Sequence, residues 1–137
     1  MPQEDYLQKY LEKLSRVIAA MFGFRQGGFP EDALRLAEET IKELLHFDID
    51  ELAIMPMDKF IDIVKNGSYS SSRLDLLAQI AHQTALSFSA VNNADKAYSY
   101  YSKALQLYYL LNEKDKTYSM EREMIIGELR MVVDGRS

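Results

Sequence analysis

The spacing of apolar residues is the feature that most restricts what this chain can fold into. Between residues 4 and 24, apolar side chains recur every three or four positions, at Leu7, Tyr10, Leu11, Leu14, Val17, Ile18, Met21 and Phe22. The same period returns in most later segments, and no segment alternates apolar and polar residues as a half-buried strand would. The sequence therefore predicts an all-α fold.

Glycine and proline divide this pattern into antiparallel helical hairpins. Gly23, Gly27 and Gly28 end the first helix, and Pro30 opens the second. In the segment that follows, Asp50 is expected to cap a short turn. We expect a first hairpin over residues 4–45, an inserted segment with a short helix over 47–70, a second hairpin over 73–111 and a C-terminal capping helix over 115–133. This makes one domain of about six helices over residues 1–137.

The composition sets limits on the possible partners. The chain has 16 Lys and Arg against 21 Asp and Glu, a net charge of -5, so we expect no nucleic-acid partner, because phosphate binding needs clustered positive charge. The absence of cysteine excludes disulfides, thiolate metal sites and a cysteine nucleophile. The longest apolar run, residues 17–22, is far shorter than the about 18 residues that span a bilayer. We expect a cytoplasmic protein without a membrane partner.

Two segments of the predicted hairpins are related in pattern. In the second hairpin, small and aromatic residues alternate in a fixed order at Ala85, Phe88, Ala97, Tyr101 and Ala104. Small residues allow two antiparallel helices to approach closely, and the aromatic rings fill the space between turns. A weaker copy begins at Ala33, which lies 64 residues before Ala97.

This arrangement resembles the tetratricopeptide repeat (TPR), in which a small residue and an aromatic residue on helix A face an Ala-x3-aromatic-x2-Ala pattern on helix B. Residues 95–107 are the best match. A continuous TPR array repeats every ~34 residues, so we interpret residues 47–70 as an insertion between two units of a TPR-like right-handed solenoid. The whole chain is also similar to a group of short uncharacterised bacterial proteins with TPR-like halves, and this resemblance implies no particular activity.

The resemblance implies a peptide-binding surface on the concave side of successive A helices. The matching positions are Asp75, Gln79, His82, Leu86 and Ser89 in the second hairpin, and Ser15, Ile18, Phe22 and Arg25 in the first. A clamp for the C-terminal carboxylates of chaperone tails would need Lys and Asn here, and Ile18 and Phe22 occupy two of those positions. We therefore expect a protein or peptide partner of another kind.

His82 suggests an alternative to peptide binding. Asp75, Gln79 and His82 follow one another at i, i+4 and i+7, so a hydrogen-bonded trio or a partial metal site is geometrically possible. Our preferred interpretation is a partly exposed histidine on a polar stripe, because a metal would need more ligands; we predict no metal and no cofactor. The alternative function is a helical small-molecule sensor or hydrolase-like protein that uses His82 and Asp75.

The sequence contains none of the common catalytic motifs. There is no G-x-S-x-G, no P-loop, no G-x-G-x-x-G and no H-E-x-x-H. Asp58 and Asp62 are four residues apart, but they alternate with lysines in the way that is typical of a solvated helix face. We therefore predict that the protein is not an enzyme.

The C-terminal helix carries two apolar faces. Tyr118, Ile125, Leu129, Val132 and Val133 form the expected docking face, and a second stripe on the other side consists of Met120, Met124, Gly127 and Met131. The end of a repeat protein is expected to be polar, so a methionine stripe with a glycine gap indicates a further packing surface. Our leading prediction is a non-enzymatic interaction or scaffold protein that self-associates as a homodimer through this stripe. The alternative is that its own monomer encloses the helix.

Overall fold

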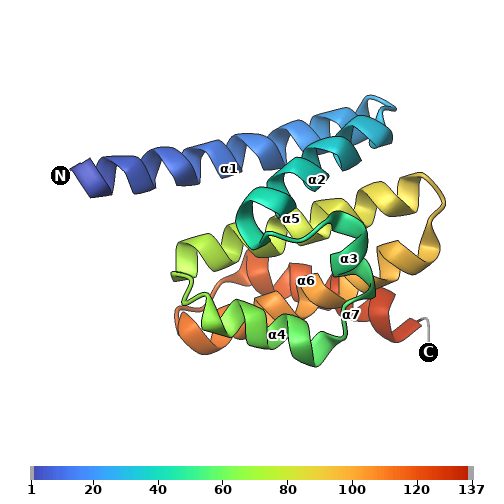
Figure 1. Ribbon diagram of the computed structural model, residues 1–137. Coiled ribbons are helices and arrows are strands. Elements are labelled where there is room, and N and C mark those ends of the chain that lie inside the picture. Colours follow the sequence, from blue (N-terminus) through green and yellow to red (C-terminus); the bar gives the residue numbers. More distant parts are fainter. Residues whose placement is uncertain (1, 136–137) are drawn as a thin grey trace.

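The computed structural model describes the main chain of residues 2–135 and the side chains of residues 5–135. Over this range the fold is all-α, which confirms the predicted class, and it contains seven helices (Figure 1). They are α1 (Pro2–Gln26), α2 (Pro30–Leu45), α3 (Ile49–Ile54), α4 (Met57–Asn66), α5 (Ser71–Ala90), α6 (Ala94–Lys114) and α7 (Met120–Gly135).

The antiparallel pair of α5 and α6 forms the centre of the molecule. α5 packs against both helices of the α1–α2 hairpin and against α6. α6 in turn contacts α3, α4 and α7. Figure 1 accordingly shows the α1–α2 hairpin along one side of α5 and the remaining helices gathered around α6.

Small side chains allow α5 and α6 to lie close together. Ala85 on α5 and Ala97 and Ala104 on α6 are buried in the common core. Phe88 of α5 stacks on Tyr100 of α6 with ring centroids 5.7 Å apart. Since an alanine extends only a methyl group from the helix, the two backbones can approach and the aromatic rings fill the gaps that remain.

A tight turn joins α1 to α2. Gly28 has a φ of 87°, in the left-handed region where a Cβ atom is unfavourable. Pro30 then occupies the first turn of α2, where its missing N–H costs nothing, and Glu31 and Asp32 lie beside the positive end of the helix dipole.

The inserted segment contains two helices, α3 and α4, where the sequence predicted one. The expected turn at Asp50 is wrong: Asp50 lies inside the first turn of α3, and Asp48 is the capping residue. Glu51 explains the difference, because its carboxylate accepts a hydrogen bond from the main-chain nitrogen of Asp48 at 3.1 Å and completes a capping box.

One face of α6 holds α3 in place by hydrogen bonds to its main chain. The hydroxyl of Tyr100 donates to the carbonyl of Ile49 at 2.7 Å, and the hydroxyl of Ser99 donates to the carbonyl of Ala53. The Nζ of Lys96 adds an ion pair of 2.7 Å with the carboxylate of Asp50. A six-residue helix has few internal hydrogen bonds, so these donors from α6 add to the stabilisation that the capping box gives α3.

Lys103 is the buried member of this set. Its side chain is 3% exposed, and its Nζ donates to the carbonyl of Met55 at 3.0 Å and to Ser99 Oγ at 3.0 Å. The Nζ also lies 5.7 Å from the ring centroid of Phe60 on α4. Burial lowers the pKa of the Lys103 ammonium. Lys103 thus joins α6 to both helices of the inserted segment.

The last helix begins later than the sequence predicted. α7 starts at Met120, not at residue 115, because Asp115 bonds to the main-chain nitrogen of Thr117 and to the guanidinium of Arg122 and so forms a loop. Ser119 accepts a hydrogen bond from the main-chain nitrogen of Arg122 at 3.1 Å, in the manner of an N-cap.

The docking face of α7 agrees with the prediction at Leu129, which is buried, and at Ile125 and Val133, which pack against the core, but not at Tyr118 or Val132. Ile126 and Leu129 are buried, whereas Tyr118 and Val132 are 73% and 44% exposed. Tyr118 precedes the helix, and Val132 lies to one side of the contact that Ile126 and Leu129 make. The prediction that Tyr118 and Val132 dock on the rest of the chain is therefore wrong.

Replacement of Lys103 by methionine tests the attachment of the inserted segment. Lys103→Met keeps an apolar stem but leaves the carbonyl of Met55 without this donor, so we expect a loss of about 1 to 3 kcal/mol in the free energy of unfolding. Urea denaturation measures the change. Lys59→Met, at an exposed position of α4, is the matched control and should change stability little. A Lys103→Met protein as stable as the control would contradict the proposed role.

Candidate functional site

The structure divides the predicted stripe on α5 into two parts. At the first part, Gln79 Nε2 donates to Asp75 Oδ1 at 3.3 Å. Both side chains line a cavity of about 150 Å³. The rest of its lining comes from α6, from the loop before α7 and from α7 itself, and consists of Tyr108, Ser119, Glu121, Arg122 and Ile125. None of these lining residues comes from α1, so Asp75 and Gln79 do not share a groove with Ile18 and Phe22.

The second part of the stripe lies where α1 and α7 approach α5 and α6. The half-buried ring of His82 packs against the ring of Tyr101, with centroids 6.3 Å apart and planes tilted by 59°. Arg25 reaches from α1 and donates a hydrogen bond to Gln83 Oε1, while its guanidinium carbon lies 5.2 Å from the ring centroid of Phe22. We call Phe22, Arg25, His82, Ser89 and Tyr101 the α5 groove.

Burial and three nearby polar groups set the charge of the α5 groove. Burial lowers the pKa of His82, with a smaller lowering from Arg25 and an opposing effect from Glu128 of α7. Burial raises the pKa of Tyr101, against a hydrogen bond with Ser89 and the charge of Arg25. At neutral pH the α5 groove therefore presents a neutral imidazole and a neutral phenol beside one guanidinium.

A cavity of about 420 Å³ continues the α5 groove toward the C-terminal end of α7. Ser89 and Tyr101 belong to its lining, which also includes Ala94, Ala97, Tyr98, Val132 and Gly135. The exposed side chain of Val132 therefore borders this cavity. The cavity thus reaches from Ser89 and Tyr101 of the α5 groove to Val132 on α7, whereas Phe22, Arg25 and His82 are not part of its lining.

Two further residues of the predicted groove, Ile18 and Leu86, are half-buried. Ile18 packs against the core. His82 and Asp75 lie on one face of α5, but His82 is not part of the cavity that Asp75 lines.

Two residues that act on the α5 groove were not apparent from the sequence. Gln83 binds Arg25 of α1, and Glu128 acts on His82 from α7. Both effects depend on how α1 and α7 pack on α5, for which the sequence offers no local signal. The sequence contained one indication of a contact between α1 and α5, because Arg25 lies on the same predicted stripe of α1 as Phe22.

Ser99 and Lys103 form the closest approach to a catalytic pair. Their side chains are 3.0 Å apart, and a lysine of lowered pKa beside a serine is one way to activate a nucleophile. Here the hydroxyl of Ser99 donates to the carbonyl of Ala53, and Lys103 donates to that of Met55. Both side chains therefore form hydrogen bonds with main-chain carbonyls of the inserted segment, and together they hold α3 against α6.

The methionine stripe of α7, which comprises Met120, Met124, Gly127 and Met131, is open to solvent. The three methionines are 67%, 62% and 78% exposed, and a Cβ added at Gly127 would meet no atom within 4 Å. The intervals of four, three and four residues are those of successive d and a positions in a heptad. Large exposed apolar side chains in such a row are characteristic of a helix–helix contact.

Within the described residues, no group of three or more His, Cys, Asp or Glu side chains could hold a metal ion, and no helix is long and apolar enough to cross a membrane. Comparison of the chain with protein-family models, with curated proteins and with solved structures gave no match.

The lowered pKa of His82 predicts a specific loss of stability in acid. An unfolded chain binds a proton at the ordinary histidine pKa of 6.5, and the folded chain does so only at lower pH. The contribution of neutral His82 to the free energy of unfolding is therefore fully present above pH 6.5. It is lost as the pH falls from 6.5 through the lowered pKa of His82 in the folded chain. His82→Gln should reduce the loss of unfolding free energy between pH 7 and pH 5, which urea denaturation measures.

His46→Asn is the control for this experiment. His46 is the other histidine of the chain, exposed at the end of α2 with a φ of 63° that asparagine tolerates. This variant should retain the wild-type loss of stability in acid. Equal pH dependence in His82→Gln and the wild type would show that His82 is not buried as a neutral group.

Proposed function

We propose that this chain is a non-enzymatic protein-interaction or scaffold module that self-associates as a homodimer through α7. The observation that carries the proposal is the methionine stripe, because three large flexible apolar side chains stand in solvent around a glycine that leaves room for a second helix. Methionine suits such a contact, since its unbranched thioether adapts to the opposing surface. Ile126 and Leu129 already bury the other side of α7 against its own chain.

The occupant that best fits the stripe is a second copy of α7 in antiparallel orientation. In an antiparallel pairing of heptads, a positions face d positions. Met120 would then face Met131 of the second copy, and Met124 would face Gly127. A two-fold axis repeats each contact, so one stripe supplies both halves of the interface.

Charged side chains beside the stripe favour the same orientation. Glu123 and Arg130 precede Met124 and Met131 by one residue, at the g positions of the heptad. Antiparallel pairing brings Glu123 of each copy near Arg130 of the other. This attraction offsets the repulsion between Glu121 and Glu128 on the opposite flank. Parallel pairing would bring Glu123 near Glu128 of the other copy without such an offset. Exposed ion pairs contribute little affinity, but they select the orientation of approach.

We propose further that the two hairpins are related as TPR-like units and that the α5 groove is a contact surface for a peptide. Two features support this relation: α5 packs on both α1 and α2, and Ala85, Ala97 and Ala104 are buried. The α5 groove offers the combination that extended peptides need, with aromatic edges at Phe22 and Tyr101 and a cation at Arg25.

A charged substitution in the stripe tests self-association. Met124→Glu places a carboxylate at the centre of the proposed interface, so the dimer mass should fall to the monomer mass. Light scattering at about 100 µM is suitable, because an interface of one helix is smaller than the about 1,200 to 2,000 Å² of stable complexes and is expected to be weak.

Ile54→Glu is the matched control for Met124→Glu. Ile54 is 83% exposed on α3, outside the stripe, so this variant should keep the wild-type mass. A wild-type protein that is a monomer at this concentration would refute the proposal. The same holds if Ile54→Glu dissociates the assembly as effectively as Met124→Glu.

Disulfide cross-linking tests the orientation of the two helices. The chain lacks cysteine, so Met120→Cys and Met131→Cys together create the only thiols. Along one helix these positions are ~16 Å apart, too far for an internal disulfide. We expect the double variant to form covalent dimers on oxidation and each single variant to form few. Efficient dimers from the single variants would indicate a parallel pairing instead.

A further inference from the structure

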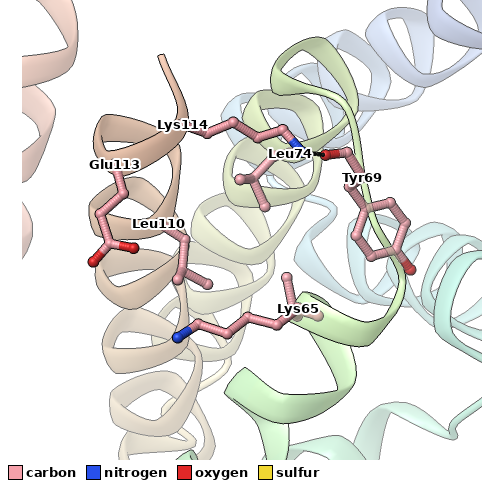
Figure 2. A pocket seen from close by; sticks show the side chains of 7 residues that line it. Lys65, Tyr69, Leu74, Leu110, Glu113 and Lys114 are labelled. Atoms are coloured by element: carbon pink, nitrogen blue, oxygen red, sulfur yellow. Dashed lines mark hydrogen bonds between the residues drawn. The ribbon is translucent and has the colours of Figure 1, made fainter. Parts of the chain in front are cut away.

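A cleft lies at the end of the molecule where α4 and α6 finish and α5 begins. It has a volume of about 330 Å³ and is lined by Val64, Lys65, Tyr69, Leu74, Leu110, Glu113 and Lys114 (Figure 2). None of these residues belongs to α7 or to the α5 groove. The cleft is therefore independent of both surfaces on which the proposed function depends.

The inner surface of the cleft is apolar. Val64 and Leu74 are buried, and Leu110 is half-buried. Figure 2 shows Leu74 and Leu110 between the ends of α5 and α6, with the ring of Tyr69 as the opposite wall. Arg73 supports this wall, because its guanidinium carbon lies 5.1 Å from the ring centroid of Tyr69 and 5.4 Å from that of Tyr10.

The rim of the cleft carries two ammonium groups. Lys114 crosses one end and donates to the carbonyl of Tyr69, and Figure 2 shows Lys65 extending from α4 toward α6 below Leu110. An ammonium has three donors, so Lys114 keeps donors for another acceptor. Glu113 is the one carboxylate of the lining, and Figure 2 places it on the side of α6 away from Tyr69.

We propose that this cleft binds a small monocarboxylate with an apolar chain. The chain would lie on Val64, Leu74 and Leu110, and the carboxylate would accept hydrogen bonds from Lys65 and Lys114. Apolar walls with a few convergent polar groups are the usual composition of a small-molecule site, and the volume is at the lower end of the range for such sites. The Lys114 to Tyr69 bond closes one end, which favours a short ligand over an extended peptide.

Titration of the full chain with octanoate tests this proposal. The methyl signals of Val64, Leu74 and Leu110 in an NMR spectrum should shift in a saturable manner. Octylammonium has the same apolar chain with the opposite charge, and it should bind about tenfold more weakly or not at all, since it meets two lysines. Inorganic phosphate, which has no apolar part, should leave the methyl signals unchanged.

Lys65→Gln separates the charge from the apolar contact. This variant should weaken octanoate binding by about two- to fivefold, the effect of one exposed ion pair. Lys59→Gln changes an exposed lysine of α4 outside the cleft and should bind octanoate as the wild type does. Equal affinity for octanoate and octylammonium, shifts that lie mainly outside the cleft, or no saturation would each overturn the proposal. Self-association through α7 would stand or fall separately.

Discussion

The close packing of α5 on α6 is the constraint on which the rest of the structure depends. Alanines at positions 85, 97 and 104 let the two helices approach, and every other helix then packs on one member of this pair. The α1–α2 hairpin covers α5, whereas the inserted helices and α7 cover α6. Because these contacts bury most of α5, only a narrow stripe of it remains between α1 and α7, and this stripe contains His82.

The inserted segment and α7 are attached to α6 in ways that leave different surfaces open. The inserted segment is held by buried apolar side chains such as Leu52 and Phe60 and by polar groups, with Ser99, Tyr100 and Lys103 donating to its main-chain carbonyls. The terminal helix α7 is held by Ile126 and Leu129, so its methionine stripe faces away from the chain. The contacts of α3 and α4 therefore complete the core, whereas α7 keeps an exposed apolar face.

Periodicity predicted the helical class and most helix positions, since 3.6-residue spacing is a local property. It did not predict contacts that arise only in the packed chain. Lys103 looks like a surface residue in sequence, yet it is 3% exposed because the carbonyl of Met55 compensates its burial. Similarly, Glu128 approaches His82 only because α7 begins after the loop at Asp115. In contrast, the spacing of the methionine stripe was sufficient to predict that it lies on a different side of α7 from the residues that dock on the chain.

The proposed pairing of α7 with a second copy of itself would bring methionine methyl groups of the two chains into contact. The most direct measurement is an isotope-filtered NMR experiment on a mixed sample, in which one population carries ¹³C-labelled methionine methyl groups and the other is unlabelled. We expect contacts between the labelled methyl of Met120 and the unlabelled methyl of Met131, and between labelled Met131 and unlabelled Met120, and these contacts should weaken on dilution. Methionine signals that show no contact between chains and do not change with concentration would contradict the proposed pairing.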